Sequence, residues 1–234
     1  MAIKICLDAG HYGKYNQSPA VKTYYESEMN WKLHNLLKNE LEKYGFEVIT
    51  TRAKQAVDLE VTLRGKASKG CDLFLSLHSN AVAGGVNETY DYPVAIVQVT
   101  GKGNKLGEKL ANVVQKTIGT KQAGRVVTKK NSVGGDWYGV LRGAAAVGTM
   151  GIILEHSFHT NTAATKWLMD DGNLAKMAKA EAEVIADYYG VKKQTATKTL
   201  YRIQLGAFSD KKNADTMLAK VKAAGFKDAY IEAK

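Results

Sequence analysis

Two histidines stand at the ends of apolar segments that have the composition of buried strands. His11 ends the segment ICLDAGH, and His78 directly follows LFLSL. If the two strands are parallel neighbours, both imidazoles emerge at the carboxyl edge of the sheet, where α/β proteins place their ligands. A histidine at a strand end is commonly only a polar cap on a core element. The pair therefore leaves a metal site and a structural role equally open.

A carboxylate on a predicted helix could complete such a site. Glu26 is in register with Asn30 and Leu33, at steps of three and four, on the inward stripe of a helix predicted over 26–44. Glu28 lies about 200° away around that helix and is predicted to face solvent. A carboxylate in a buried stripe is costly unless it is paired or binds a metal. The plainer interpretation is a glutamate in the first turn, favoured by the helix dipole.

His11, Glu26 and His78 together form a set of two histidines and one glutamate. Catalytic zinc typically takes three protein ligands of this kind and leaves a fourth position for water, whose pKa the metal lowers toward about 7. Hydrolysis at such a site also needs a carboxylate that accepts the proton of the water. Glu155 is the candidate, because it ends the apolar strand-like segment 151–154.

Strand-like and helix-like segments alternate over the first 190 residues. Strands are predicted near 3–7, 46–51, 73–77, 94–99 and 152–155, and helices near 26–44, 58–68, 103–118, 161–170 and 174–189. Continuous apolar strands separated by amphipathic helices predict an α/β sheet that is covered on both faces.

The pattern changes near the carboxyl end of the chain. Residues 191–199 are polar and have no apolar period, so they are predicted to form a linker. A strand at 200–208, a helix near 211–224 and a short strand at 229–231 follow it. This small βαβ unit, 200–234, is too short for a substantial core of its own.

Composition narrows the class of protein. With 45% hydrophobic and 24% charged residues, the chain has the composition of a folded globular protein. The net charge of +10 favours polyanionic partners such as nucleic acid, anionic lipid or teichoic acids. Because the lysines are spread along the chain without a nucleic-acid-binding motif, we expect no nucleic-acid partner.

The sequence also bears on membranes and export. No apolar run approaches the roughly 18 to 20 residues that span a bilayer, so membrane insertion is not expected. The first eight residues have the pattern of a strand and not of a signal peptide. We therefore expect synthesis in the cytoplasm and release by lysis or by a non-standard route.

Several segments, taken in order, resemble a known enzyme family. They are DAGH at 8–11, Glu26 with Asn30, TR at 51–52, LSLHSNA at 75–81 and LEHSFHTN at 154–161. Each is weak alone, but the ordered set resembles the zinc-dependent N-acetylmuramoyl-L-alanine amidases of autolysins, sporulation lytic enzymes and phage endolysins. The resemblance covers about residues 2–190.

The resemblance implies a site and an activity. Zn²⁺ would bind to His11, Glu26 and His78, and Glu155 would be the catalytic carboxylate, on a twisted, mainly parallel sheet flanked by helices. The reaction would cleave the amide between N-acetylmuramic acid and L-alanine in peptidoglycan. Asn80 and Arg142 are weaker candidates for substrate contacts, and the aromatic residues before Arg142 look like the start of a strand.

Two other functions stay open. A zinc peptidase of the stem peptide could use the same ligands. A non-catalytic wall-binding protein is also conceivable, although the presence of Glu155 and all three ligands argues against it. Neither the resemblance nor the residues separate a phage endolysin from a sporulation autolysin of the host.

The segment 200–234 resembles one half of a sporulation-related (SPOR) repeat, a family that binds glycan strands. Family members of the spore-former type carry two βαβ halves in tandem, whereas one is visible here. The chain is therefore predicted to have a catalytic domain at 1–190, a linker at 191–199 and a wall-binding half repeat at 200–234. Peptidoglycan is the expected partner, with teichoic acids as a further candidate and a monomer as the favoured state.

The chain departs from the family at two places. The family often has glycines after the first histidine, whereas this chain has YGKYN at 12–16, which predicts a differently shaped substrate groove. His156 and His159 flank Glu155 where the family commonly has apolar or small residues. We expect them to support the site or to lie at the surface, and not to bind the metal. His34, on the first helix, is expected to face solvent.

Overall fold

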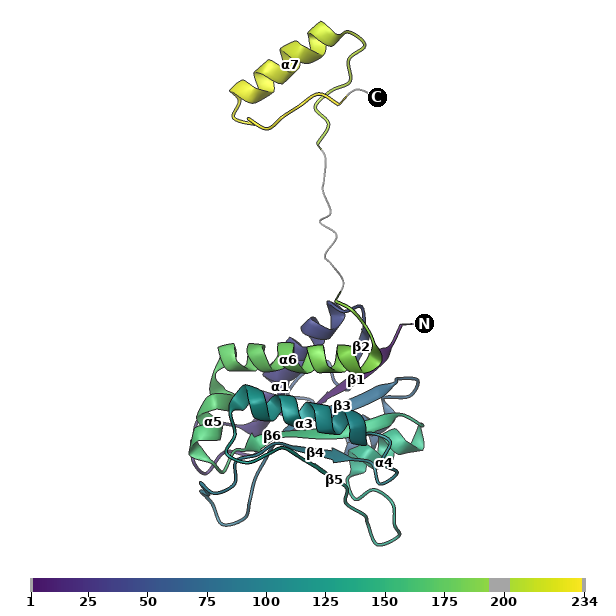
Figure 1. The fold of residues 1–234 in the computed structure, drawn as a ribbon, viewed down its shortest axis with the longest axis vertical. Coiled ribbons are helices and arrows are strands. Elements are labelled where there is room, and N and C mark those ends of the chain that lie inside the picture. The colour runs from purple at the N-terminus through teal and green to yellow at the C-terminus, as the bar shows by residue number, and fades with distance from the viewer. Residues whose placement is uncertain (1, 194–202, 233–234) are drawn as a thin grey trace. The chain divides into compact units, whose positions relative to one another are not determined.

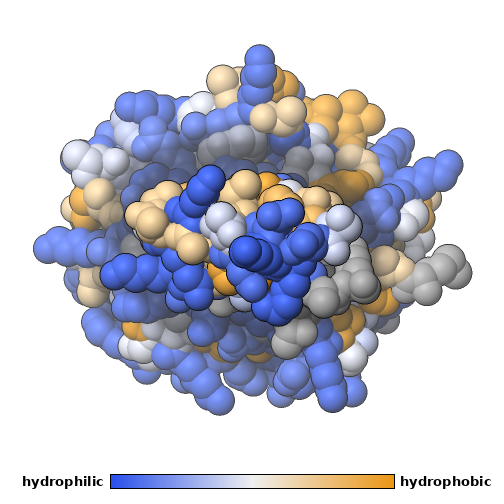
Figure 2. All heavy atoms as spheres, turned by 90° about the horizontal axis from the view of Figure 1, so that it is seen from above, coloured by the Kyte–Doolittle hydropathy of each residue, from blue (hydrophilic) through white to orange (hydrophobic). Residues whose placement is uncertain are grey.

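The computed structural model describes residues 2–193 and 203–232 (Figure 1). The chain divides into two compact units, residues 1–195 and 196–234. None of the helices in the described part is long and apolar enough to cross a membrane. The face drawn in Figure 2 is mostly hydrophilic, with apolar residues in small groups.

The first unit is built on one six-stranded sheet with the strand order β2-β1-β3-β6-β4-β5. Its strands are β1 (Lys4–Ala9), β2 (Glu47–Thr50), β3 (Leu73–Asn80), β4 (Val94–Val97), β5 (Arg125–Val127) and β6 (Met150–Phe158). All neighbouring pairs are parallel except β4 and β6, which are antiparallel. The predicted α/β fold with a mainly parallel sheet is confirmed.

Six helices flank this sheet. They are α1 (Glu26–Glu42), α2 (Val61–Lys66), α3 (Asn104–Ile118), α4 (Gly139–Ala146), α5 (Thr162–Met169) and α6 (Asp171–Tyr189). The larger core lies between one face of the sheet and helices α1, α3 and α6, and α3 and α6 run side by side (Figure 1). On the opposite face α4 packs against the sheet over a smaller core.

The alternation of side chains along β3 decides what each face carries. Leu75 and Leu77 belong to the larger core, whereas Phe74 belongs to the smaller one under α4. Because successive side chains of a strand point to opposite faces, Ser76 and His78 lie on the same face as Phe74. Ser76 and His78 therefore lie on the α4 face, and His78 lies near the carboxyl end of its strand.

The helix α4 was not predicted, and the expected strand start before Arg142 is wrong. The segment GVLRGAAA forms a helix that packs very closely against α2. A Cβ atom on Gly65 would lie 2.1 Å from the carbonyl oxygen of Val140, and one on Gly143 would lie 2.2 Å from that of Thr62. Only glycine fits such contacts, which no local pattern reveals. The three-residue strand β5 was also missed.

The second unit contains the helix α7 (Lys211–Ala223), close to the range predicted for it. Asp210 caps its start by accepting a hydrogen bond from the Lys212 N–H, and Gly225, with φ of +102°, follows its end. The flanking segments 203–208 and 229–231, predicted as strands, form no strand ladder in the part of the chain that the structure describes. Two strands and one helix bury too little apolar surface to hold a ladder alone.

Candidate metal centre

The candidate ligands converge at the carboxyl ends of β1 and β3. His11 follows β1, His78 lies near the end of β3, and Glu26 begins α1. Gly10 leaves room for the His78 ring, because a Cβ atom at this position would lie 2.2 Å from Cε1 of that ring. The sheet edge and the helix terminus thus bring together three residues that are distant in sequence.

Glu26 lies between the two imidazoles. Its Oε1 atom is 2.9 Å from Nδ1 of His78, and its Oε2 atom is 3.2 Å from Nε2 of His11. The three ligand atoms all lie within 4.8 Å of one another. The Ser79 N–H and the side-chain amide of Asn16 also donate hydrogen bonds to the Glu26 carboxylate, at 3.1 and 2.8 Å.

The charge state of Glu26 suits a cation. The side chain is only 2% exposed, and burial alone would raise the pKa of its carboxyl group. The neighbouring imidazoles of His11 and His78 overcome this effect and hold the pKa well below the ordinary value. Two imidazole nitrogens and one ionised carboxylate are the donor set that zinc takes in catalytic sites, so the residues present fit this metal.

The backbone at His11 is held in place by two buried arginines. His11 has φ of +60°, a conformation that few residues other than glycine adopt. Arg52 donates hydrogen bonds to the carbonyl oxygens of Ala9 and His11, and Arg64 approaches the same oxygens at 3.3 and 3.4 Å. These contacts fix the direction in which the His11 side chain leaves the strand.

Glu155 lies directly across from His78 in the ladder between β3 and β6. Paired residues of neighbouring parallel strands project to the same face, so the carboxyl group is beside the ligand set. Its Oε2 atom is enclosed and has no hydrogen-bond partner among the described residues. Burial, and then the negative charge of Glu26, raise the pKa of Glu155 well above the ordinary value.

His156 and His159 contact the backbone of β3 next to the candidate ligand His78. Nε2 of His156 is 2.6 Å from Oε1 of Glu181 on α6, and its Nδ1 is 2.9 Å from the carbonyl oxygen of His78. Nδ1 of His159 is 2.9 Å from the carbonyl oxygen of Ser79. Both rings are buried and contact the backbone that carries His78.

The expectation that His34 faces solvent is wrong. Its side chain is only 2% exposed, and the ring stacks on Trp31 with 5.1 Å between centroids. Burial lowers the pKa of His34 to about 4, so the imidazole is neutral near pH 7. The ring belongs to the buried side of α1 and not to the side that faces solvent.

The two weaker candidates lie outside the ligand cluster. Asn80 ends β3 and its side chain accepts a hydrogen bond from the Ala81 N–H at 2.8 Å. Arg142 donates to the carbonyl oxygens of Asp136 and Trp137, in the loop before α4. Their roles toward a substrate stay predictions.

Sequence reasoning missed two polar residues at the site. Asn16, in a left-handed conformation with φ of +53°, places its side-chain nitrogen 3.0 Å from Nε2 of His11. No periodic signal points to this loop residue. Ser76 lies 3.2 Å from Nε2 of His78, and the alternation of β3 could have identified it, because it shares a face with His78.

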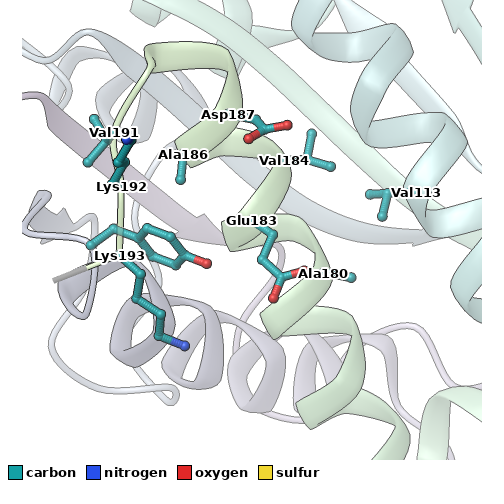
Figure 3. Close-up of a pocket in the computed structure, with 10 residues that line it drawn as sticks. Val113, Ala180, Glu183, Val184, Ala186, Asp187, Val191, Lys192 and Lys193 are labelled. Atoms are coloured by element: carbon teal, nitrogen blue, oxygen red, sulfur yellow. The ribbon is translucent and has the colours of Figure 1, made fainter. Parts of the chain in front are cut away.

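The pocket in Figure 3 is separate from this site. It is lined by Tyr44, Val113, Lys192 and Lys193 together with residues of α6. Tyr44 follows the C-terminal end of α1, whereas Glu26 is at the N-terminal end. At 1.5 Å per residue the two ends are about 25 Å apart. None of the candidate site residues lines this pocket.

The fold and this geometry agree with what the chain is similar to. The profile of the N-acetylmuramoyl-L-alanine amidase family matches residues 5–187. The chain belongs to this family. A second profile, that of the SPOR domain, matches residues 172–233, a range that includes α7 and all but the first residue of α6.

Similar proteins carry the same family name. The N-acetylmuramoyl-L-alanine amidase CwlM of Bacillus licheniformis is 28% identical over 98% of this chain and 84% of its own length. The sporulation-specific N-acetylmuramoyl-L-alanine amidase of Bacillus subtilis (strain 168) is 25% identical over 96% and 82%. Among solved structures, an N-acetylmuramoyl-L-alanine amidase from Clostridium difficile 630 shares the fold, with a TM-score of 0.69 and 18% identity, covering 81% of this chain and 97% of its own.

Proposed function

We propose that this chain is a zinc-dependent amidase that hydrolyses the bond between N-acetylmuramic acid and L-alanine in peptidoglycan. Membership of the amidase family supports the reaction. The observation that carries the proposal is the buried, ionised Glu26 between His11 and His78. Glu155 lies across the ladder from His78 and supplies the second carboxylate that hydrolysis requires.

The residues divide the chemical work. His11, Glu26 and His78 would hold the zinc ion, which supplies a Lewis acid that polarises the scissile amide and lowers the pKa of water. Glu155 accepts the proton of the attacking water and passes it to the departing amine of L-alanine. A carboxyl group of raised pKa suits this exchange, because its carboxylate is a stronger base than an ordinary one and takes up the proton of water more readily.

The second unit is proposed to hold the enzyme on its substrate. Residues 200–233 of the proposed half repeat 200–234 lie within the SPOR match, and the first 190 residues form the catalytic domain. The net charge of +10 favours retention on anionic walls, including those that carry teichoic acids. In this proposal the protein acts at the cell wall as a monomer.

Identification of the reaction products tests the proposed function. Purified full-length protein with zinc is incubated with insoluble peptidoglycan, and the new amino termini and released fragments are identified. We expect free L-alanine amino termini and muramic acid that keeps its lactyl group, with neither product formed by Glu155→Gln. New amino termini at any other residue would assign the chain to the stem-peptide peptidases instead.

A further inference from the structure

Two buried polar residues, Asp8 and Ser76, form a chain of hydrogen bonds that ends at His78. Oγ of Ser76 lies 2.7 Å from Oδ2 of Asp8 and 3.2 Å from Nε2 of His78. Asp8 and Ser76 are both fully buried. The other oxygen of Asp8, Oδ1, accepts a hydrogen bond from the Thr51 hydroxyl at 2.6 Å, and it lies 3.8 Å from Nη1 of Arg64.

The number of hydrogens sets the direction of these bonds. The Ser76 hydroxyl has one hydrogen, and it can go either to Asp8 or to His78. Among the described residues, Ser76 is the donor to Asp8 Oδ2, whereas Glu26 Oε1 also accepts the N–H of Ser79. Turning the hydroxyl toward His78 would leave a buried carboxylate oxygen without that donor, which is more costly than losing one of several donors at Glu26, since the Asn30 amide also approaches Oε1 at 3.5 Å.

The Ser76 oxygen therefore accepts a hydrogen bond, and the donor is the Nε2–H group of His78. A neutral imidazole with its hydrogen on Nε2 has a lone pair on Nδ1. This Nδ1 atom is 2.9 Å from Oε1 of Glu26. Two acceptors at that distance repel each other unless a cation binds to both.

We propose that Asp8 and Ser76 are positioning residues that keep the hydrogen of His78 on Nε2 and so make Nδ1 its zinc-binding atom. The proposal deepens the proposed function and rests on its zinc site. Partners that orient a ligand histidine typically change metal affinity by about 10- to 100-fold when they are replaced.

Replacing Asp8 by asparagine reverses the chain of hydrogen bonds. The new carbonyl oxygen takes the place of Oδ1, because the Thr51 hydroxyl and the Arg64 guanidinium both face that atom. The new amide nitrogen then faces Ser76 and donates to it. The Ser76 hydroxyl turns toward Nε2 of His78, and the imidazole hydrogen moves to Nδ1, where it competes with zinc.

The experiment compares the full-length parent with Asp8→Asn, Ser76→Ala and Thr51→Val. Thr51→Val is the matched control, since it removes a hydrogen bond to Asp8 without reversing Ser76. Nitrogen-15 NMR of the histidine rings, on protein supplied with the same concentration of zinc in every sample, locates the hydrogen on His78. Zinc affinity is measured with a competing chelator, and a thermal melt checks that each variant is folded.

We expect the hydrogen on Nε2 in the parent and in Thr51→Val, and on Nδ1 in Asp8→Asn. Zinc affinity should fall at least about tenfold in Asp8→Asn and Ser76→Ala and stay within about threefold in the control. A parent hydrogen on Nδ1 overturns the proposal. So does a zinc affinity of Ser76→Ala within about twofold of the parent's, which decides the matter if Asp8→Asn does not fold. Because neither measurement uses peptidoglycan, failure of the proposed amidase activity would be seen separately.

Discussion

Glu26 and Glu28 are two residues apart on the same helix, yet their surroundings are opposite. Glu26 is almost fully buried between two imidazoles. The side chain of Glu28 is 38% exposed, and its nearest cation is Lys14 at 3.9 Å. The helical phase predicted from the sequence is therefore the phase that the structure has.

The contrast predicts how two single substitutions affect metal binding. Glu26→Gln should weaken zinc binding markedly, because an amide oxygen is a poorer ligand than a carboxylate and carries no charge. Glu28→Gln removes a solvent-exposed charge and should leave the affinity close to the parent's. Titration against a competing chelator measures both. Loss of zinc by Glu28→Gln, with Glu26→Gln unaffected, would contradict the ligand set.

Glu155 is predicted to act in the reaction and not in metal binding. Glu155→Gln keeps the shape and a hydrogen-bonding group but cannot accept a proton. We expect the variant to hold about one zinc ion per chain and to lose about 10²- to 10⁴-fold in the rate of amide hydrolysis. Metal analysis and wall-digestion rates on the same preparation separate the two effects. A rate within about tenfold of the parent's would show that another group serves as the base.

At the scale of elements, the sequence predicted best those helices and strands that are long and have a regular apolar pattern. α1 and β3 have long apolar periods, and their core positions and their site residues, Glu26 and His78, were placed on the right faces. The helix α4 is short and contains two glycines, so its formation depends on close packing against α2, which is distant in sequence. Local pattern carries no signal for such a contact.

His34 was misplaced for a different reason. It follows Asn30 by four residues and precedes Leu37 by three, so the helical phase itself points it inward. The residue type, which is usually exposed or half-buried, outweighed that signal in the prediction. The position of Asn16 and the backbone conformation of His11 had no comparable signal in the sequence. Both depend on hydrogen bonds with segments that are distant along the chain.

The burial of His34 predicts an acid-sensitive contribution to the free energy of unfolding. Its folded pKa of about 4 lies below the ordinary value of 6.5, so the unfolded chain binds the proton more readily. This term is fully present above about pH 6.5 and is lost as the pH falls toward about 4, by roughly 3 kcal/mol in total. His34→Gln should lose less of its unfolding free energy over that interval than the parent.

Denaturant unfolding at several pH values, with chelator present in all samples, measures this difference. The chelator removes the contribution of metal release, since protonation of ligand histidines would otherwise act over the same interval. Equal pH dependence in the parent and in His34→Gln would mean that the ring is protonated in the folded protein. The buried environment of α1 would then have to be more polar than its contacts indicate.

At the scale of the whole molecule, the two units differ in how they are stabilised. The hydrophobic cores of the described chain consist of residues of the first unit, and the same unit contains all the candidate zinc ligands. In the second unit α7 has no buried residue, and large apolar side chains such as Phe226 and Tyr230 are exposed. Exposed apolar surface on a small unit is typical of a segment that contacts a ligand or a partner.

A chain that ends at Thr195 should therefore remain folded and active on small substrates. We expect it to bind about one zinc ion and to cleave soluble muropeptides at a rate within about twofold of the full chain's, because no core residue is lost. Its binding to insoluble peptidoglycan should fall several-fold, since the unit proposed to contact glycan is absent and one of two linked contacts to the wall is removed. Sedimentation with purified walls, beside a rate assay on soluble fragments, measures the two properties.

Two substitutions in the full chain control for the loss of mass and charge in the shortened one. Phe226→Asp changes an exposed apolar residue of the second unit, and Val133→Asp changes one of the first unit, which is also highly exposed. If the second unit holds the wall through its apolar surface, Phe226→Asp should reduce sedimentation with walls while Val133→Asp does not. Equal retention of all three variants would place wall binding in the first unit, and the exposed residues around α7 would need another partner.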